Sequence, residues 1–445
     1  MPPKSTAAAR WRDALRTNPD YVVYVPADDD TPEHDTGPRP DGPWDNGNTH
    51  FIVTVTTTGA FLATWTQAGD HFHGVNVRIV TARSEDRGRT WSRPTVIEAP
   101  PDDSGKTPVW SVPVVVPHSG RVWLFYHRNT GPVDFDRGMT GVLSWRVSDD
   151  DGVTWGERHD AVIGRGAIDD PDPAMLSSWV PTGWQAPIVN RRGQVICPMT
   201  RWASNHYQRQ FETVTSEIGF NARHHEGWFL RFDNVMTVDD PADLVVTTWP
   251  DADHGIQVEH PRDPRISCAM EPSIQNLSDG RILAVMRTMT GWVWYSVSED
   301  YGESWTEAAP LRFQPGGPPI PHPSSPCPLH KLRDGRFLLF FHNNDGTAHG
   351  ADGPGDGKAR RPVCVSVGRE IDNPGGQPLV FGRPHVLADN KYAVHSVTGR
   401  GGGMPIYGSF TDYAGEQVLW YPDNTTYLLG KRLTDEVLDD AWLPR

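Results

Sequence analysis

Residues 270–305, MEPSIQNLSDGRILAVMRTMTGWVWYSVSEDYGESW, contain the pattern that decides the fold of this chain. Apolar and polar residues alternate along residues 273–277, 282–287 and 292–297, and this period of two predicts three short strands. Ser, Asp and Gly at 278–280 predict a tight turn between the first two strands, and a Thr/Gly turn precedes the third. The stretch therefore predicts consecutive antiparallel strands.

The third predicted strand runs into residues 298–305, an octad of the form S-x-D-x-G-x-S/T-W. Ser298 and Asp300 can hydrogen-bond nearby backbone amides, and Gly302 can adopt a positive φ at no steric cost. The octad recurs at residues 84–91 and 148–155. Because these residue types satisfy a tight turn without any chemistry, we expect a structural role for all three copies.

The three octads resemble the Asp-box, or BNR, repeats of the sialidase (neuraminidase) superfamily. That resemblance implies an all-β fold, a six-bladed β-propeller of four-stranded antiparallel blades. The sequence supports six blades, because a turn glycine followed by an apolar strand occurs six times, at Gly59, Gly120, Gly193, Gly280, Gly335 and Gly415.

The domain prediction follows from the repeat. We expect residues 1–48 to form an N-terminal lead-in and loop with a strand that closes the last blade, since a propeller otherwise leaves exposed sheet edges. Residues 49–435 are predicted to form the propeller and residues 436–445 a C-terminal tail. The 43 Gly, 41 Pro and 18 Trp among 445 residues favour a turn-rich all-β protein.

The formal charge of −15 is spread along the chain, and it argues against nucleic acid or an anionic membrane as a partner. The four cysteines lack metal-binding spacing, so we expect buried thiols. No segment has the apolar run of a signal peptide or a transmembrane helix, which predicts a cytoplasmic protein, or a secreted one if a leader precedes this sequence. The chemistry discussed below requires no cofactor, and the oligomeric state stays open.

Candidate functional residues follow from blade geometry. Glu271 lies nine positions before its turn glycine and Arg287 seven after it, so a hairpin brings the two together at one end of the blade. The same offsets in the other blades, or positions one residue further on, predict a polar ring around the propeller axis. Its further members are His50 and Gln67 in blade one, Ser111 and His127 in blade two, Trp184 or Gln185 and Arg201 in blade three, His342 beside Asn343 in blade five, and Tyr407 in blade six.

The sialidase resemblance gives some of these residues roles. In sialidases a glutamate begins an inner strand and an arginine ends the next strand sixteen positions later, and Glu271 and Arg287 match in type and spacing. The resemblance implies that Glu271 polarises a tyrosine nucleophile, and Tyr407 is placed like that tyrosine. It also implies a substrate arginine after a strand of blade five, where Arg360 and Arg361 are candidates.

The sequence departs from the sialidase pattern in blade one. Thr49-His50-Phe51 replaces the Arg-Ile-Pro element of the arginine triad, and GDHFHG, with Asp70, His71 and His73, replaces the loop that carries the expected carboxylate. A full three-arginine clamp for a sialic acid carboxylate is therefore not evident, although Asp70 can still supply an acid.

Two mechanisms compete for these residues. In a retaining glycoside hydrolase, Tyr407 attacks the anomeric carbon while Glu271 accepts its proton, Asp70 or a histidine acts as acid/base, and Arg287 binds an acidic sugar. We expect the remaining substrate contacts from residues around the axis, namely Arg201, His127, Gln67, His342, Arg361 and His73.

The alternative is a polysaccharide lyase. His50 and His71 are 21 residues apart across one hairpin, similar to the histidine pair of propeller lyases that act on uronate-containing glycans. There a histidine or tyrosine removes the proton α to the carboxylate, and an arginine neutralises that carboxylate. A third possibility is a sugar-binding propeller without catalysis, in which Arg287 and Glu271 form only a structural ion pair.

Overall fold

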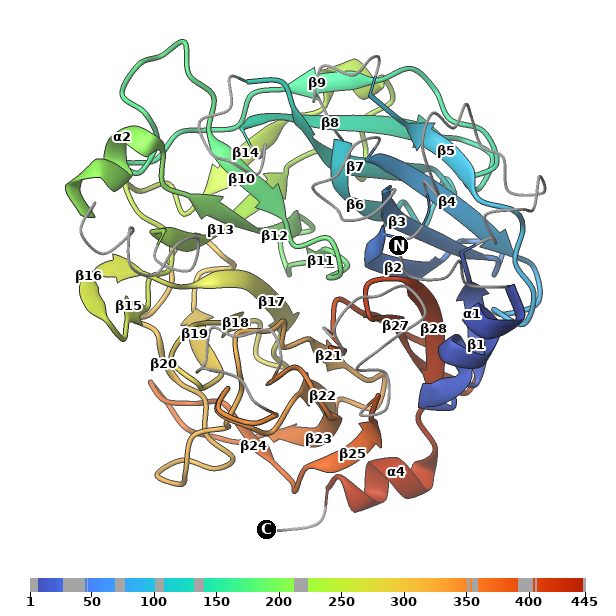
Figure 1. Ribbon diagram of the computed structural model, residues 1–445. Helices are drawn as coiled ribbons and strands as arrows, with labels where there is room; N and C mark the ends of the chain where they lie inside the picture. The colour runs from blue at the N-terminus through green and yellow to red at the C-terminus, as the bar shows by residue number, and fades with distance from the viewer. Residues whose placement is uncertain are drawn as a thin grey trace, which may run out of the picture.

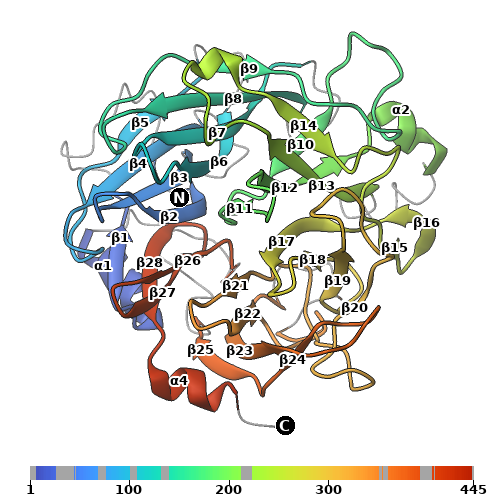
Figure 2. The ribbon, with the colours of Figure 1, turned by 180° about the vertical axis from the view of Figure 1, so that it is seen from behind.

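The computed structural model is a closed ring of six antiparallel sheets, seen from the front in Figure 1 and from behind in Figure 2. It describes residues 7–26, 45, 47–68, 77–100, 108–131, 140–211, 223–349, 353, 359–390, 403–404 and 406–442. Each sheet is one blade with its first strand nearest the axis. The predicted six-bladed propeller is thereby confirmed.

Blades one to three occupy the first half of the ring. Blade one contains β2 (Gly47–Val55), β3 (Phe61–Ala68), β4 (Arg78–Ser84) and β5 (Thr95–Glu98). Blade two contains β6 (Pro108–Val115), β7 (Val122–Asn129), β8 (Gly141–Ser148) and β9 (His159–Ala161). Blade three contains β10 (Ser178–Pro181), β11 (Ile188–Val189), β12 (Val195–Trp202), β13 (His225–Phe232) and β14 (Val246–Trp249).

Blades four to six complete the ring. Blade four contains β17 (Met270–Asn276), β18 (Ile282–Arg287), β19 (Trp294–Ser298) and β20 (Ala309–Pro310). Blade five contains β21 (Leu329–Lys331), β22 (Phe337–Phe341), β23 (Val363–Glu370), β24 (Leu379–Phe381) and β25 (His385–Ala388). Blade six contains β26 (Ser409–Tyr413), β27 (Glu416–Asp423), β28 (Tyr427–Arg432) and β1 (Tyr21–Tyr24).

The remaining elements lie outside the blades. A two-stranded ribbon, β15 (Glu259–His260) and β16 (Asp263–Ser267), precedes blade four, and the α-helices are α1 (Ala7–Ala14), α2 (Asn205–Gln208) and α4 (Asp435–Asp440). In the portion of the chain that the structure describes, no helix combines the length and the apolar composition that a membrane crossing requires. All four cysteines are buried free thiols.

The hydrophobic core lies between the blades. Each cluster of buried side chains joins neighbouring sheets: Trp123 and Phe125 of blade two pack with Trp228 and Leu230 of blade three, and comparable clusters occupy the other junctions. This follows from strands whose two faces are both apolar, because each sheet is covered by a blade on either side. Every blade therefore depends on both neighbours.

The octads form the turns predicted for them. In the first, Asp86 Oδ1 accepts hydrogen bonds from the Thr90 backbone N–H at 2.8 Å and from Ser84 Oγ at 2.8 Å. Ser84 Oγ in turn accepts from the Gly88 N–H at 2.7 Å. The bonds from Thr90 lead in lowering the pKa of Asp86 to about 2. The other two octads repeat this arrangement.

Each octad also places its own blade in contact with the blade before it. Gly88 has φ of 86°, and a Cβ there would lie 2.5 Å from the Trp420 ring of blade six. Gly302 has φ of 104°, and its Cβ would lie 2.9 Å from Ile196 of blade three. Glycine is required at both positions, because a side chain would meet the backbone constraint and the neighbouring blade together.

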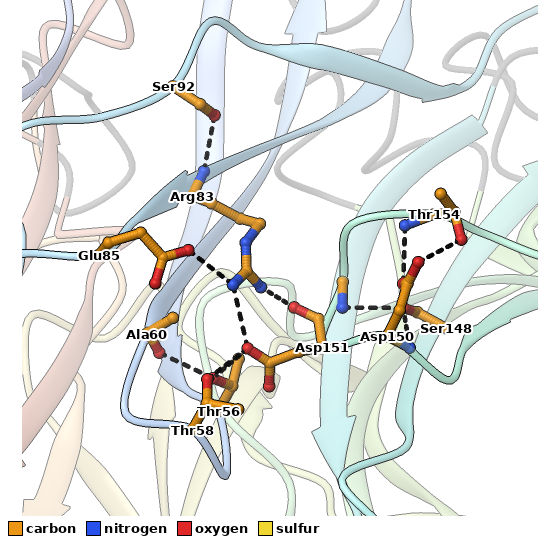
Figure 3. A network of polar contacts seen from close by, with 11 residues as sticks. Thr56, Thr58, Ala60, Arg83, Glu85, Ser92, Ser148, Asp150, Asp151 and Thr154 are labelled. Atoms are coloured by element: carbon orange, nitrogen blue, oxygen red, sulfur yellow. Dashed lines mark hydrogen bonds and ion pairs between the residues drawn. The ribbon is translucent and has the colours of Figure 1, made fainter.

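A polar network reinforces the seat of blade two on blade one (Figure 3). Asp151, in the turn of the second octad, accepts hydrogen bonds from Thr56 at 2.9 Å and Thr58 at 2.6 Å, both in the first turn of blade one. Arg83 of β4 ion-pairs with the same carboxylate at 3.0 Å. The octad turn is thus fixed by its own bonds and by its neighbour.

The chain ends close the ring. β1 pairs antiparallel with β28, with Tyr21 opposite Gly430, and the blue and red segments lie side by side in both ribbon views (Figures 1 and 2). Tyr427 of β28 donates a hydrogen bond to Asp13 of α1 at 2.9 Å. The N-terminal strand thereby covers the edge that blade six would otherwise expose.

We predict that the octad hydrogen bonds contribute to stability. Asp150→Ala removes the acceptor for the Thr154 N–H, Thr154 Oγ1 and Ser148 Oγ, and should lower the free energy of unfolding by about 1 to 2 kcal/mol. Urea denaturation measures the change. Glu157→Ala, an exposed residue just after the same octad, should stay within about 0.5 kcal/mol of the unmodified protein. Equal effects of both substitutions would contradict the prediction.

A second prediction concerns pH. Burial raises the pKa of Asp423 to about 7, above the value of about 3.9 for an unfolded chain. The group therefore favours folding most below pH 4, and that contribution is lost as pH rises through 7, at about 1.4 kcal/mol per pH unit between the two pKa values. Asp423→Asn, which keeps the acceptor for Asn390 Nδ2, should flatten the fall of stability between pH 5 and pH 8. Urea denaturation across this range that shows parallel curves would refute it.

Candidate functional site

One arginine joins two blades at the centre of the ring. Arg287 Nη1, at the end of β18, donates to Glu271 Oε2 at 3.0 Å and to the Tyr407 phenol oxygen at 3.3 Å. Glu271 lies on β17, whereas Tyr407 directly precedes β26 in blade six. All three are buried, with exposed fractions of 5% to 8%. Burial by itself lowers the Arg287 pKa, but Glu271 and Tyr407 outweigh it and leave that pKa above its ordinary value.

A second arginine approaches the same tyrosine from blade five. Ser324 holds both guanidinium groups: its Oγ accepts from Arg287 Nε at 3.0 Å, and its carbonyl oxygen accepts from Arg360 Nε at 3.0 Å. Burial lowers the Arg360 pKa, and the nearby Tyr407 opposes this effect. We call Glu271, Arg287, Ser324, Arg360 and Tyr407 the tyrosine cluster.

The chain reaches this centre through a repeated local distortion. His50, Trp110 and Glu271 have φ of 52°, 58° and 48°, in the left-handed region that side chains rarely occupy. Each lies where the pairing register of its inner strand shifts, in β2, β6 and β17. Bulges of this kind re-aim a side chain. The inner strands of blades one, two and four thus each contain a bulge that changes the direction of a large side chain.

Threonines of the preceding blades hold two of these bulges. The Trp110 N–H donates to Thr66 Oγ1 at 2.8 Å, and the Glu271 N–H donates to Thr200 Oγ1 at 2.7 Å. Thr66 and Thr200 each stand seven positions after their turn glycines, as Arg287 does in blade four. This strand position therefore faces the entry of the next blade.

An aromatic stack adjoins the cluster. The His50 ring lies 4.0 Å from the Trp110 ring and 4.6 Å from the Tyr407 ring, centre to centre. Trp110 in turn lies 6.4 Å from Trp202, and Trp202 lies 6.5 Å from His225. His50 thus belongs to a row of aromatic rings that ends at Tyr407.

Blade two departs from the predicted offset. The bulge residue is Trp110, one position before the predicted Ser111, because the turn of this blade is one residue longer. Val55 pairs with Phe61 in blade one, whereas Val115 pairs with Val122 in blade two. The prediction placed this residue nine positions before the turn glycine. Because the turn has one extra residue, the bulge lies ten positions before the glycine, at Trp110.

The structure does not bring Gln67 and Arg201 to the tyrosine cluster. Each lies eight positions after its turn glycine, and adjacent strand residues point to opposite faces of the sheet. Gln67 hydrogen-bonds Asn48 at 3.1 Å and Arg78 at 3.0 Å. Arg201 is fully buried and pairs with Asp169 at 2.7 Å. Both side chains are engaged on the face away from Thr66 and Thr200.

Two predicted histidines are buried supports. His127 is fully buried against the edge of Trp179, with ring centres 5.0 Å apart, and burial lowers its pKa to about 3. The His342 Nε2 lies 3.0 Å from Ser325 Oγ, and burial lowers the His342 pKa well below its ordinary value. His342 therefore steadies the turn that carries Ser324.

Of the remaining predicted residues, Arg361 lies away from Tyr407, and the other three are not described. Arg361 ion-pairs with Asp389 at 3.4 Å, so the candidate that meets Tyr407 is its neighbour Arg360. Asp70, His71 and His73 lie in residues 69–76, outside the described residues. Among the residues that are described, no group of three or more His, Cys, Asp or Glu is arranged to hold a metal.

Sequence reasoning missed Ser324, whereas it placed His225 in a loop over the centre of the propeller. Ser324 lies in a Pro-rich connection without periodicity, so no signal marked it. His225 begins β13; its Nδ1 lies 2.6 Å from the Arg223 carbonyl oxygen and must carry the proton, because a carbonyl only accepts. Among the described residues His225 Nε2 has no hydrogen-bond partner, and burial lowers the His225 pKa to about 3.

The sequence matches the BNR repeat-like domain family over residues 59–394. The chain belongs to this family. No curated protein sequence matches it.

Solved structures share the fold of this BNR-repeat protein. A Hadza microbial sialidase, Hz136, is 15% identical with a TM-score of 0.57; the match covers 88% of this chain and 66% of that one. A protein of unknown function from Dyadobacter fermentans is 13% identical with a TM-score of 0.55 and coverages of 93% and 97%. The NanB sialidase from Streptococcus pneumoniae is 12% identical with a TM-score of 0.57 and coverages of 90% and 70%. At these identities the likeness shows the fold, a sialidase-like propeller.

We predict that Glu271 and Arg287 are energetically coupled. Glu271→Gln leaves a buried cation without its carboxylate and should lower the free energy of unfolding by about 3 kcal/mol. The double variant Glu271→Gln, Arg287→Gln should lose less than the sum of the single variants, with a coupling of about 1 to 3 kcal/mol. Urea denaturation provides the values. Glu303→Gln, which breaks the exposed pair with Arg192, is the control and should change stability by less than about 1 kcal/mol; additive effects at Glu271 and Arg287 would show that they act independently.

Proposed function

We propose that this BNR-repeat protein is a sialidase-like glycoside hydrolase that forms a covalent intermediate on Tyr407. One observation carries the proposal: the Arg287 guanidinium bridges Glu271 and Tyr407 across blades four and six. A phenol and a carboxylate that accept hydrogen bonds from the same arginine nitrogen lie close together, as a nucleophile and its activating groups must. The family membership and the fold agree with a carbohydrate-active enzyme.

Each member of the tyrosine cluster has a role in this proposal. The Tyr407 oxygen bonds to the anomeric carbon as the glycosidic C–O bond breaks, and Glu271 takes the phenol proton. Arg287 and Arg360 stabilise negative charge on the phenol oxygen before attack and when the intermediate breaks down. An acid protonates the departing oxygen and then draws a proton from the water that releases the sugar. Asp70 is the candidate for this acid/base.

The preferred substrate is a glycan that ends in an acidic sugar. Arg287 and Arg360 supply two guanidinium groups, and such groups bind carboxylates through paired N–H donors. The site differs from a three-arginine clamp because Thr49-His50-Phe51 replaces the Arg-Ile-Pro element, and the His50 ring lies beside the rings of Trp110 and Tyr407. We therefore propose an acidic sugar other than sialic acid.

One observation favours a second candidate, a uronate lyase. The His50 ring is 4.6 Å from the Tyr407 ring, so a histidine and a tyrosine stand together beside two arginines. In this alternative His50 or Tyr407 removes the proton α to a uronate carboxylate, and Arg287 neutralises that carboxylate. The glycosidic oxygen on the β-carbon then leaves by β-elimination. His71, the predicted partner of His50, is not among the described residues.

We predict that the two mechanisms separate by product. The protein is incubated with sialylated, glucuronate-terminated and galacturonate-terminated oligosaccharides while absorbance at about 235 nm and new reducing ends are both followed. Hydrolysis gives reducing ends alone, whereas elimination also gives the absorbance of an unsaturated uronate. Tyr407→Phe should reduce kcat at least about 1000-fold, because the nucleophile is lost. Glu271→Gln should reduce kcat at least about 100-fold.

The control for Tyr407→Phe is Tyr413→Phe, which removes the hydroxyl of a half-buried tyrosine of the same blade, on β26. It should keep kcat within about twofold. Rising absorbance that depends on His50 would replace the hydrolase proposal with the lyase. Turnover by Tyr407→Phe at the unmodified rate would overturn the assigned nucleophile.

A further inference from the structure

Two stacked histidines lie behind the arginines of the tyrosine cluster. His322 and His342 are buried, with exposed fractions of 1% and 0%, and their ring centres lie 5.5 Å apart at an angle of 3° between the planes. His322 lies in the connection from β20 to β21, and His342 directly follows β22. We call residues 322–326, which include Ser324, the Ser324 segment. The two rings join this segment to the end of β22.

The hydrogen bonds of His322 fix the position of its proton. Its Nε2 lies 2.8 Å from the Ser325 carbonyl oxygen and 3.1 Å from the Pro326 carbonyl oxygen. A carbonyl oxygen only accepts, so Nε2 carries the proton. The unprotonated Nδ1 accepts from the His342 backbone N–H at 3.2 Å. His322 therefore links the Ser324 segment to β22 through one donor and one acceptor.

His342 connects the same segment to the one that carries Arg360. Its Nδ1 lies 2.9 Å from the Pro362 carbonyl oxygen, so this nitrogen carries the proton. In the neutral ring Nε2 is an acceptor, and it lies 3.0 Å from Ser325 Oγ. Ser325 follows Ser324, and Pro362 is two residues after Arg360. His342 thus bridges the two segments that are also joined by the bond from Arg360 Nε to the Ser324 carbonyl oxygen.

Only the neutral forms of both rings satisfy these hydrogen bonds. A second proton on His322 would lie on Nδ1, facing the backbone N–H of His342. A second proton on His342 would remove the acceptor for Ser325 Oγ. Burial lowers the pKa of His322 to about 4 and the pKa of His342 well below its ordinary value. The charged and titratable groups that act on the pair from neighbouring segments are Arg287, Arg360 and His349.

Ser324 is the point at which the histidine pair reaches the tyrosine cluster. Its Oγ accepts from Arg287 Nε at 3.0 Å, and its carbonyl oxygen accepts from Arg360 Nε at 3.0 Å. Both bonds use Nε, so the terminal nitrogens of each guanidinium remain for other partners, as Arg287 Nη1 shows with Glu271 and Tyr407. A displacement of the Ser324 segment would therefore move both guanidinium groups.

We propose that His322 and His342 are positioning residues, which hold Arg287 and Arg360 at the spacing that a substrate carboxylate requires. This inference rests on the proposed function, because it concerns the arginines assigned there to an acidic sugar. The histidines act through the Ser324 segment and do not touch the substrate. Charged groups bind a carboxylate best when their geometry is fixed before the substrate arrives. The neutral histidine pair supplies that fixed geometry.

The test compares two substitutions of one histidine in the full-length protein. His322→Phe keeps a ring and removes both hydrogen-bonding nitrogens, whereas His322→Gln keeps an N–H donor near the position of Nε2. We measure kcat/KM with the acidic oligosaccharide that the unmodified protein converts fastest. His322→Phe should lower kcat/KM at least about tenfold, because the arginines lose their alignment. His322→Gln should stay within about threefold of the unmodified protein, since the donor is kept.

A smaller substitution guards against misfolding of His322→Phe. Ser325→Ala removes the hydroxyl group at 3.0 Å from His342 Nε2 and should lower kcat/KM at least about fivefold. The control is His385→Phe, a histidine of the same blade on β25 that lies 2.6 Å from Asp440 Oδ2. It should keep kcat/KM within about twofold. Thermal denaturation of every variant is measured in parallel.

Crystal structures of the variants provide a measurement that does not depend on turnover. In His322→Phe at least one of the bonds from Arg287 Nε and Arg360 Nε to Ser324 should lengthen beyond about 3.5 Å, and both should be restored in His322→Gln. If the unmodified protein converts no acidic oligosaccharide, the proposed function fails and the crystal structures still decide the role of the histidines. Unchanged arginine positions in His322→Phe would overturn that role.

The kinetic results can also overturn the inference while the proposed function stands. A purely structural role predicts lower thermal stability with kcat/KM unchanged in both His322→Phe and Ser325→Ala. Equal losses of kcat/KM in His322→Phe and His322→Gln would show that the Nε2 donor does not align the arginines. Either result would overturn the positioning role.

Discussion

The seating of each blade on its neighbour is the constraint on which this structure depends. The octad turns are stiffened by their own Ser and Asp hydrogen bonds, and the bare backbone of Gly88 or Gly302 then meets the preceding blade. Both faces of each sheet are apolar. Loss of the contact between two blades would therefore expose the facing apolar surface of each of them to water. The stability of each blade therefore depends on the closed ring, and the pairing of β1 with β28 closes it.

The same blade-to-blade contact builds the candidate active site. Thr200 of blade three holds the Glu271 backbone, Ser324 of blade five holds Arg287, and Arg287 reaches Tyr407 of blade six. No blade contains the site alone. A buried ion pair such as Arg287 with Glu271 is weak evidence for stability, because desolvation offsets much of its attraction. Its extension to a tyrosine and a second arginine is what favours a chemical role.

Neighbouring residues of one strand, β12, hold two different acidic residues. Thr200 and Arg201 are consecutive, and the alternation of a β-strand sends one to Glu271 and the other to Asp169. The Arg201 pKa is lowered by burial, an effect that Asp169 and Glu226 oppose. The ion pair with Asp169 offsets part of the free-energy cost of burying Arg201.

The sequence by itself determined the propeller, the octad turns and the relation of Glu271 to Arg287, because these depend on local periodicity, turn chemistry and spacing within one hairpin. Tertiary structure alone decided the rest. An extra turn residue moved the bulge of blade two to Trp110, and strand alternation turned Arg201 toward Asp169. Ser324 had no local signal, since its role exists only where blades four and five meet. A local pattern specifies a blade, whereas contacts between blades depend on positions that are distant in the sequence.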